Sequence, residues 1–242
     1  IPWTSYYVNH SYGQDKRAMY DLQQFLNELP RDKKYWTIVQ YDDSILNDVS
    51  HLDILRFEMS KNIGYQLPLL CQQHSYQHDG AKDIFASFIG GKTHPIREHL
   101  LALGGHYDYY ISFARHDITE YCKVMARSIF NLAPRGYGAN SFRMAEGMQY
   151  QSIPVYISDG EFIFPHNLDF EEYGVIIEGK DAHQIDEILR AITPEQIIRK
   201  QDKIKEIYHS HFTYEGCQQK IIEHLCLSES LMTQPILKGI IG

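Results

Sequence analysis

The arrangement of apolar and polar positions divides the chain into two series of alternating strands and helices. In the first series a helical period covers residues 16–29, and short apolar runs typical of strands occur at residues 6–8, 35–40, 52–57 and 65–70. Residues 71–82 are polar and show no period, which is typical of a connecting segment. We therefore expect a small α/β unit that ends near residue 80.

The second series alternates more regularly than the first. Its strand-like runs cover residues 84–89, 109–113, 128–132, 153–157 and 174–177, and helical segments are expected between them at residues 95–103, 117–127 and 141–151. From residue 181 onward the period is helical, with Pro194 at the first position of a helix. Such alternation implies βαβ units and a mainly parallel sheet.

These two series predict an α/β fold with two Rossmann-like domains. We expect an amino-terminal domain at residues 1–80, a second domain at residues 81–210 and a helical segment at residues 211–242 that packs back on both. Ligands of such folds bind beyond the carboxyl ends of the strands. The cleft between the two domains is therefore the expected place for chemistry.

Composition and charge narrow the function. The 242 residues are 43% hydrophobic, as in globular proteins with a core, and the formal net charge of −8 argues against nucleic acid or anionic lipid as a partner. No apolar run is long enough to span a membrane. The four cysteines form no CxxC pair, so a reducing compartment is the simpler assumption. We expect a cytoplasmic location, or the Golgi lumen if an upstream anchor was removed.

A glycine-containing loop after the run at 128–132 is the first candidate ligand site. Asn140 or Ser141 can cap the helix that follows, and the polar and glycine positions of the segment are Arg135, Gly136, Gly138, Arg143 and Glu146. Phosphate binding needs free backbone N–H groups, close approach at glycine and a guanidinium. The alternative is a plain turn whose arginines pair with surface carboxylates.

A second turn of the same kind follows the run at 84–89. Here Gly90 and Gly91 precede Lys92, and Arg97 falls in the first turn of the next helix. Two glycine-and-cation turns at the ends of strands in one sheet can converge on one diphosphate. A plain strand-to-helix turn with Arg97 in solvent is the alternative.

Three short runs carry a family resemblance. Leu132-Ala-Pro-Arg-Gly, Ser141-Phe-Arg-Met-Ala-Glu and Ile153-Pro-Val-Tyr-Ile-Ser-Asp resemble the signature of the exostosin-like glycosyltransferases, and the resemblance covers residues 83–210. It departs at Tyr150 and Gln151, where that family usually has a small pair. The compact size is similar to that of small stand-alone members, including virus-encoded ones with xylose as a donor sugar.

The resemblance implies a GT-B architecture and transfer, with inversion, of a sugar from UDP to a hydroxyl of an oligosaccharide or glycoprotein glycan, with UDP-xylose as the favoured donor. It assigns Arg97, Arg135 and Arg143 to the departing diphosphate and Glu146 to the ribose. Because arginines can neutralise this charge and no Asp-x-Asp occurs, we expect no metal or other cofactor.

An inverting transfer needs a base for the acceptor hydroxyl, and the first domain should supply it. Asp42 and Asp43 follow the run at 35–40 and are therefore expected at its carboxyl end, facing the cleft. A solvated turn or a helix cap is their alternative. His10, placed after the first predicted strand, is the second candidate.

Two other functions remain open at this point. A transferase half that lost its base would act as a non-catalytic nucleotide-binding or glycan-binding partner subunit. A dinucleotide-dependent enzyme ranks last, because Gly-x-Gly-x-x-Gly is absent from both turns. His74 and His78 have no third ligand at a diagnostic distance, so no zinc site is expected.

Overall fold

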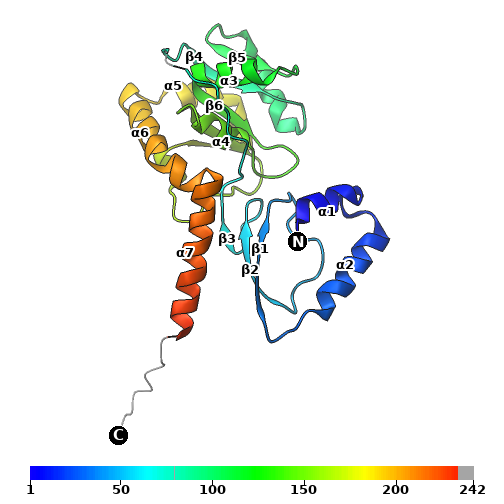
Figure 1. The fold of residues 1–242 in the computed structure, drawn as a ribbon. Helices are drawn as coiled ribbons and strands as arrows, with labels where there is room; N and C mark the ends of the chain where they lie inside the picture. Colours follow the sequence, from blue (N-terminus) through cyan, green and yellow to red (C-terminus); the bar gives the residue numbers. More distant parts are fainter. Residues whose placement is uncertain (79, 234–242) are drawn as a thin grey trace.

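The computed structural model describes residues 1–78 and 80–233, which form two parallel sheets with helices around them (Figure 1). The smaller sheet has the order β1-β2-β3, with β1 (Lys34–Val39), β2 (Asp53–Glu58) and β3 (Tyr65–Gln66). The larger sheet has the order β5-β4-β6-β7-β8, with β4 (Ile84–Ile89), β5 (Tyr109–Ser112), β6 (Ser128–Pro134), β7 (Ile153–Ser158) and β8 (Val175–Glu178). All paired strands run parallel.

The helices pack around these sheets (Figure 1). The α-helices are α1 (Trp3–Asn9), α2 (Lys16–Glu28), α3 (Ile118–Arg127), α4 (Arg143–Met148), α5 (Ile185–Arg190), α6 (Pro194–His211) and α7 (Tyr214–Thr233). The 3₁₀ segments are η1 (Ser11–Gly13), η2 (Pro95–Gly105), η3 (Phe170–Glu172) and η4 (Gly179–Gln184). A capping box between Thr193 and Gln196 starts α6, and Pro194 takes its first position as expected. No helix in the described part of the chain is long and apolar enough to cross a membrane.

The first predicted strand is wrong, because residues 6–8 lie in helix α1. Trp3 and Tyr7 are four positions apart, so both point from one face of the helix and are buried. The Trp3 indole N–H donates to Thr37 Oγ1 on β1 at 2.7 Å. Burial of two large aromatic side chains against the small sheet therefore outweighs the β propensity of the run.

Three other boundaries differ from the prediction. The run at 65–70 forms strand only at Tyr65–Gln66, the segment at 95–103 is the 3₁₀ helix η2, and the helix expected over 141–151 is only Arg143–Met148. No side-chain hydrogen bond caps α4, so the capping role expected of Asn140 or Ser141 is also wrong. Element ends depend on a few local hydrogen bonds, which the apolar period does not report.

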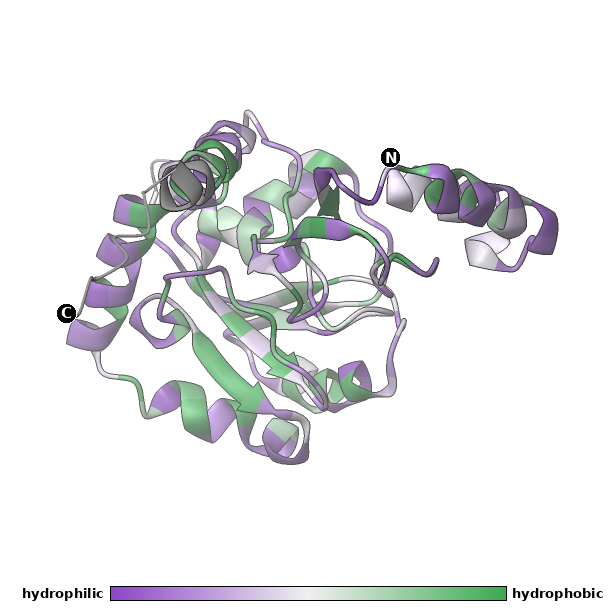
Figure 2. Cartoon of the chain, turned by 90° about the horizontal axis from the view of Figure 1, so that it is seen from below, coloured by the Kyte–Doolittle hydropathy of each residue, from purple (hydrophilic) through white to green (hydrophobic). Residues whose placement is uncertain are grey.

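The larger sheet is buried on both faces. Every residue of β7 is buried, and Figure 2 shows apolar residues along the strands of this sheet, while the outer helices carry both apolar and polar residues. The chain leaves β4 toward β5 through η2, but leaves β6 in the opposite direction toward β7 through α4. The carboxyl ends of the neighbouring strands β4 and β6 therefore flank a topological switch point.

The two sheets are joined by hydrogen bonds and by the last helix. The backbone N–H of His166 donates to the carbonyl of Gln66 on β3 at 2.9 Å, and Asn140 Nδ2 donates to the carbonyl of Met59 at 3.0 Å. Cys217 and Ile221 of α7 pack in one cluster with Phe57 of β2. These contacts bring the loop after β6 next to the carboxyl ends of β1 and β2.

Candidate functional site

A cavity of about 410 Å³ lies at the switch point. Four of the predicted residues line it together, namely Gly90 and Gly91 after β4 and Arg143 and Glu146 on α4. The rest of its wall comes from the end of β4, the segment that follows β5, and neighbouring residues of α3 and α4: Ile89, Phe113, Ala114, Arg115, His116, Tyr121 and Phe142. The structure thus brings the glycine turn after β4 next to Arg143 and Glu146 of α4, whereas the loop of residues 135–141 does not line this cavity.

Arg143 is held at the edge of this cavity by two contacts. Its Nε donates to the carbonyl of Ile89 at 2.7 Å, and its guanidinium lies over the ring of Phe88 at 4.9 Å from the centroid. A Cβ atom at Gly90 would overlap the terminal nitrogen of this guanidinium. Glycine at position 90 is therefore what allows Arg143 to lie across the end of β4.

We expect Gly90→Ala to displace Arg143 and to weaken UDP binding about tenfold or more, the effect of losing one hydrogen bond to a charged group. Stability should change little, because the atom that must move is the far end of a flexible side chain. Titration of UDP into the variant measures this. Gly91→Ala is the matched control, since a Cβ there meets only Thr93 Cγ2, at 3.7 Å. Equal affinity of both variants for UDP would contradict the role given to Gly90.

Glu146 keeps one carboxylate oxygen for a ligand. The Tyr121 hydroxyl donates to Oε2 at 2.5 Å, and burial together with the Glu146 charge raises the pKa of Tyr121. The tyrosine therefore stays protonated and orients the carboxylate from α3. Because Glu146 lines the cavity, its oxygens are available to accept hydrogen bonds from hydroxyl groups.

Arg97 does not take the exposed position that a direct phosphate contact requires. It is 4% exposed, and its guanidinium donates to three backbone carbonyls, those of Gly91 at 2.7 Å, Arg135 at 2.9 Å and Pro134 at 3.2 Å. Burial and the charge of Arg143 lower its pKa to about 10, which leaves it protonated at neutral pH. Arg97 therefore links the loop after β4 to the loop after β6. This structural role replaces the predicted direct contact of Arg97 with a diphosphate.

Arg135 is half-buried and already paired. Its Nη1 donates to Asp159 Oδ1 at 3.1 Å, just after the carboxyl end of β7, and its Nη2 donates to the carbonyl of Tyr137 at 3.3 Å. A Cβ atom at Gly136 would approach Nη2 of Arg97 to 3.1 Å. Arg135 and Gly136 lie outside the wall of the cavity. A contact between Arg135 and a diphosphate would therefore require the ion pair of Arg135 with Asp159 to open.

Asp42 meets the glycine loop from the other sheet. A Cβ atom at Gly138 would overlap the Asp42 carboxylate, so glycine at 138 permits close packing of the two units. Burial and the neighbouring Asp43 raise the pKa of Asp42, against the opposing charges of Lys61 and Arg135. Asp43 is exposed. Of the two aspartates, Asp42 is the one that the structure places against the loop between β6 and α4, residues 135–142.

The remaining predicted residues lie outside the cavity wall. Lys92 is exposed and lies over the ring of Phe113, 5.4 Å from its centroid. Ser141 is buried, and no described residue bonds its hydroxyl. His10 follows a helix rather than a strand, and its ring contacts Tyr6 and Asp15 of its own segment. The reason for proposing His10 as a base is therefore wrong. No three metal-ligating side chains converge among residues 1–78 and 80–233.

Sequence reasoning missed several residues at the site. Arg115 and His116 come shortly after β5, and Asp159 directly follows β7, at the same end of the sheet as the two glycine turns. The rule that selected Asp42, a polar residue after a strand, applies to all three. Tyr121 carried no such signal, because it lies inside an amphipathic helix whose pattern explains an aromatic residue by packing alone.

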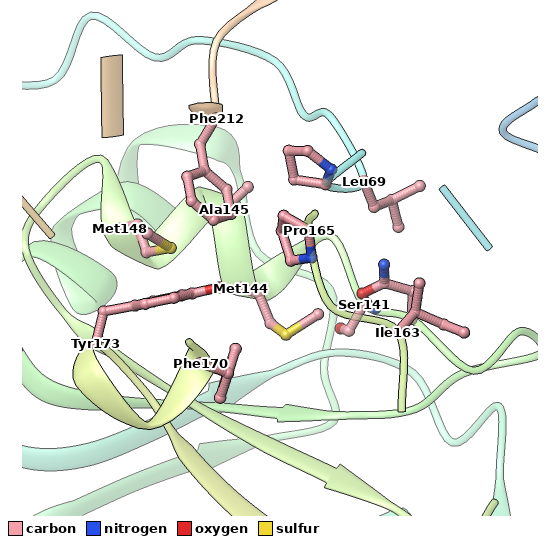
Figure 3. A pocket seen from close by; sticks show the side chains of 12 residues that line it. Leu69, Ser141, Met144, Ala145, Met148, Ile163, Pro165, Phe170, Tyr173 and Phe212 are labelled. Atoms are coloured by element: carbon pink, nitrogen blue, oxygen red, sulfur yellow. Dashed lines mark hydrogen bonds between the residues drawn. The ribbon is translucent and has the colours of Figure 1, made fainter. Parts of the chain in front are cut away.

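A second hollow, shown in Figure 3, is a packing defect rather than a ligand site. Met144, Ala145 and Met148 on the inner face of α4 lie opposite Phe170 and Tyr173 there. Its volume of about 10 Å³ has room for one water molecule at most. The candidate ligand site is therefore the cavity lined by Arg143 and Glu146 of α4.

Known proteins share parts of this sequence. A probable beta-1,4-xylosyltransferase of Arabidopsis thaliana, IRX10L, is 39% identical over 84 residues, which cover 34% of this chain and 20% of that protein. The Exostosin-1 homolog of Caenorhabditis elegans is 28% identical over 97 residues, 40% of this chain and 25% of that protein. The matched segment thus spans about a fifth to a quarter of these relatives.

A solved structure shares the fold. The crystal structure of TarM covers 86% of this chain, and 46% of its own chain is matched, with a TM-score of 0.52 and 11% sequence identity. This likeness concerns the fold alone, which is α/β and GT-B-like, as expected. The Exostosin GT47 domain profile matches residues 52–192, well over half of the chain, so this chain belongs to the exostosin GT47 family.

Proposed function

We propose that this chain is a glycosyltransferase that moves a sugar from a UDP-sugar to a hydroxyl of a glycan, with inversion. The observation that carries the proposal is the placement of Arg143 and Glu146 on one turn of α4, in the wall of the same cavity as Gly90 and Gly91. A guanidinium suits a diphosphate, and a carboxylate suits the hydroxyls of a ribose.

In this proposal the nucleotide lies along the carboxyl ends of β4 and β6. Arg143 holds the diphosphate, Glu146 binds the ribose, and Phe113, which also lines the cavity, offers a flat surface for the uracil ring. Lys92 and Arg115 add positive charge near the same cavity. With this charge supplied by side chains, the departing diphosphate needs no divalent cation.

Asp42 serves as the base in the proposed reaction. It takes the proton from the acceptor hydroxyl, whose oxygen forms the new bond to the anomeric carbon as the bond from that carbon to UDP breaks. Asp42 packs against Gly138, on the loop that leads to α4, and we place the acceptor on this side of the donor. Attack from that side inverts the configuration at the anomeric carbon.

Incubation with a panel of UDP-sugars and glycan acceptors, in EDTA and separately with Mn²⁺, tests the proposal. We expect UDP release and sugar transfer in EDTA, with UDP-xylose as the favoured donor because the similar plant protein is named a xylosyltransferase. UDP binding without transfer to any acceptor would favour a non-catalytic partner subunit. Absence of both binding and transfer would overturn the proposal.

A further inference from the structure

Glu58, at the carboxyl end of β2, is a buried carboxyl group that the proposed reaction does not yet use. Its side chain is fully buried, and Ser44 Oγ donates to Oε2 at 3.0 Å. The other oxygen, Oε1, has no hydrogen-bond partner among the described residues. A buried carboxyl group with one unpaired oxygen costs free energy, so its presence calls for an explanation.

The serine that binds Glu58 closes the turn that carries the two aspartates. Ser44 N–H donates to the carbonyl of Tyr41 at 2.9 Å, which makes Asp42 and Asp43 the two central residues of this turn. Ser44 has a φ of 63°, in the left-handed region that a residue with a Cβ atom rarely adopts. The bond from its hydroxyl to Glu58 fixes this unfavourable conformation.

The same end of β2 also contacts the loop of residues 135–142, which we call the donor-side loop. Met59, directly after Glu58, donates its N–H to the carbonyl of Val39 at 3.0 Å, and its carbonyl accepts from Asn140 Nδ2 at 3.0 Å. Gly138, two residues before Asn140, packs against Asp42. The end of β2 therefore contacts both the aspartate turn and the loop that leads to Arg143.

We propose that Glu58 is a positioning residue which, through Ser44, holds the Asp42–Asp43 turn against the donor-side loop in the geometry needed for transfer. The proposal rests on the proposed function for the role of Asp42, but the positioning itself is a property of the fold. Glu58 has no access to an acceptor, so it acts through the turn and not on the substrate.

Burial raises the pKa of Glu58 to about 7, although the hydrogen bond from Ser44 and the charges of Arg56 and Lys61 oppose the shift. A neutral carboxyl group still accepts a hydrogen bond through its carbonyl oxygen. Glutamine has the same shape and the same acceptor, so Glu58→Gln should preserve the turn, whereas Glu58→Ala should release it.

Hydrogen exchange tests the positioning without any need for activity. We expect the Ser44 amide to exchange about three- to tenfold faster in Glu58→Ala and in Ser44→Ala, the effect of one lost hydrogen bond, and at the wild-type rate in Glu58→Gln. Ser44→Ala removes only a hydroxyl group, so it keeps the test valid if Glu58→Ala does not fold. Wild-type exchange in both alanine variants would overturn the proposal.

Kinetics then separate positioning from donor binding. We expect kcat to fall about a hundredfold in Glu58→Ala, the scale of a small misplacement of a catalytic group, with UDP affinity unchanged and with recovery in Glu58→Gln. A loss of UDP affinity equal to the loss of kcat would contradict the proposal. If the wild-type protein transfers no sugar, the proposed function fails, and the exchange measurement still decides the role of Glu58.

Discussion

Replacement of Arg143 by alanine is expected to lower the rate of sugar transfer by roughly 30- to 1,000-fold, or about 2 to 4 kcal/mol of transition-state stabilisation. Charge grows on the diphosphate as its bond to the sugar breaks, so a cation aimed there acts mainly in the transition state. The Arg143 side chain contacts Ile89 and Phe88, and of its three guanidinium nitrogens only Nε forms a hydrogen bond among the described residues. Its terminal nitrogens are therefore available to the diphosphate. Initial rates of UDP release measure the effect.

Two further variants show whether the lower rate of Arg143→Ala results from the loss of this particular guanidinium. Arg143→Lys keeps the charge but lacks the planar fork, so we expect an intermediate rate. Arg199→Ala removes an exposed arginine of α6 and should leave the rate unchanged. Equal rates for Arg143→Ala and the wild-type protein would remove Arg143 from the site.

Asp42→Asn is expected to lower kcat by about 10²- to 10⁴-fold, the usual contribution of a general base. The amide keeps the shape of the side chain against Gly138 but cannot accept the proton of the acceptor hydroxyl. Binding of UDP should not change, because Asp42 does not line the cavity in which we propose that the nucleotide binds. Steady-state kinetics with saturating donor, together with UDP titration, measure both quantities. A fall in UDP affinity without a fall in kcat would contradict this assignment.

The pH dependence of kcat in Asp43→Asn shows which of the two aspartates is the base. The negative charge of Asp43 raises the pKa of Asp42, so its removal should lower that pKa. Because Asp42 must be ionised to act as a base, the acid limb of the kcat profile should move to lower pH in this variant. A loss of kcat as large as in Asp42→Asn would mean that Asp43 is the base. An unshifted acid limb with kcat retained would contradict the effect of the Asp43 charge on Asp42.

The positions of the loops after β4 and β6 could be predicted because their signals are local. Glycine at positions 90 and 138 is needed where a neighbouring side chain crosses the backbone, and Arg143 and Glu146 keep a one-turn spacing whatever surrounds α4. The order of strands then places both loops at one edge of the sheet. These features depend on sequence neighbours and on the general geometry of parallel sheets.

The contacts that distinguish the arginines could not be predicted in the same way. Arg97 and Arg135 carry the same charge, and both belong to glycine-containing turns that predict a phosphate contact. In the structure, however, Arg97 donates to backbone carbonyls, and Arg135 pairs with Asp159, 24 residues away. The burial of Glu58 could not be predicted from the sequence either, because a carboxylate at the end of a strand is ordinarily exposed. Its burial depends on Ser44 and on the packing between the two units.

Calorimetric titration of UDP, in EDTA, into the wild-type protein, Arg143→Ala and Arg199→Ala tests the central claim that the loops after β4 and β6 hold a nucleoside diphosphate. We expect one site in the wild-type protein, the same affinity in Arg199→Ala, and an affinity about 10- to 100-fold weaker in Arg143→Ala, as for one lost charge-assisted hydrogen bond. Absence of UDP binding to the wild-type protein, or equal affinity in all three proteins, would contradict it.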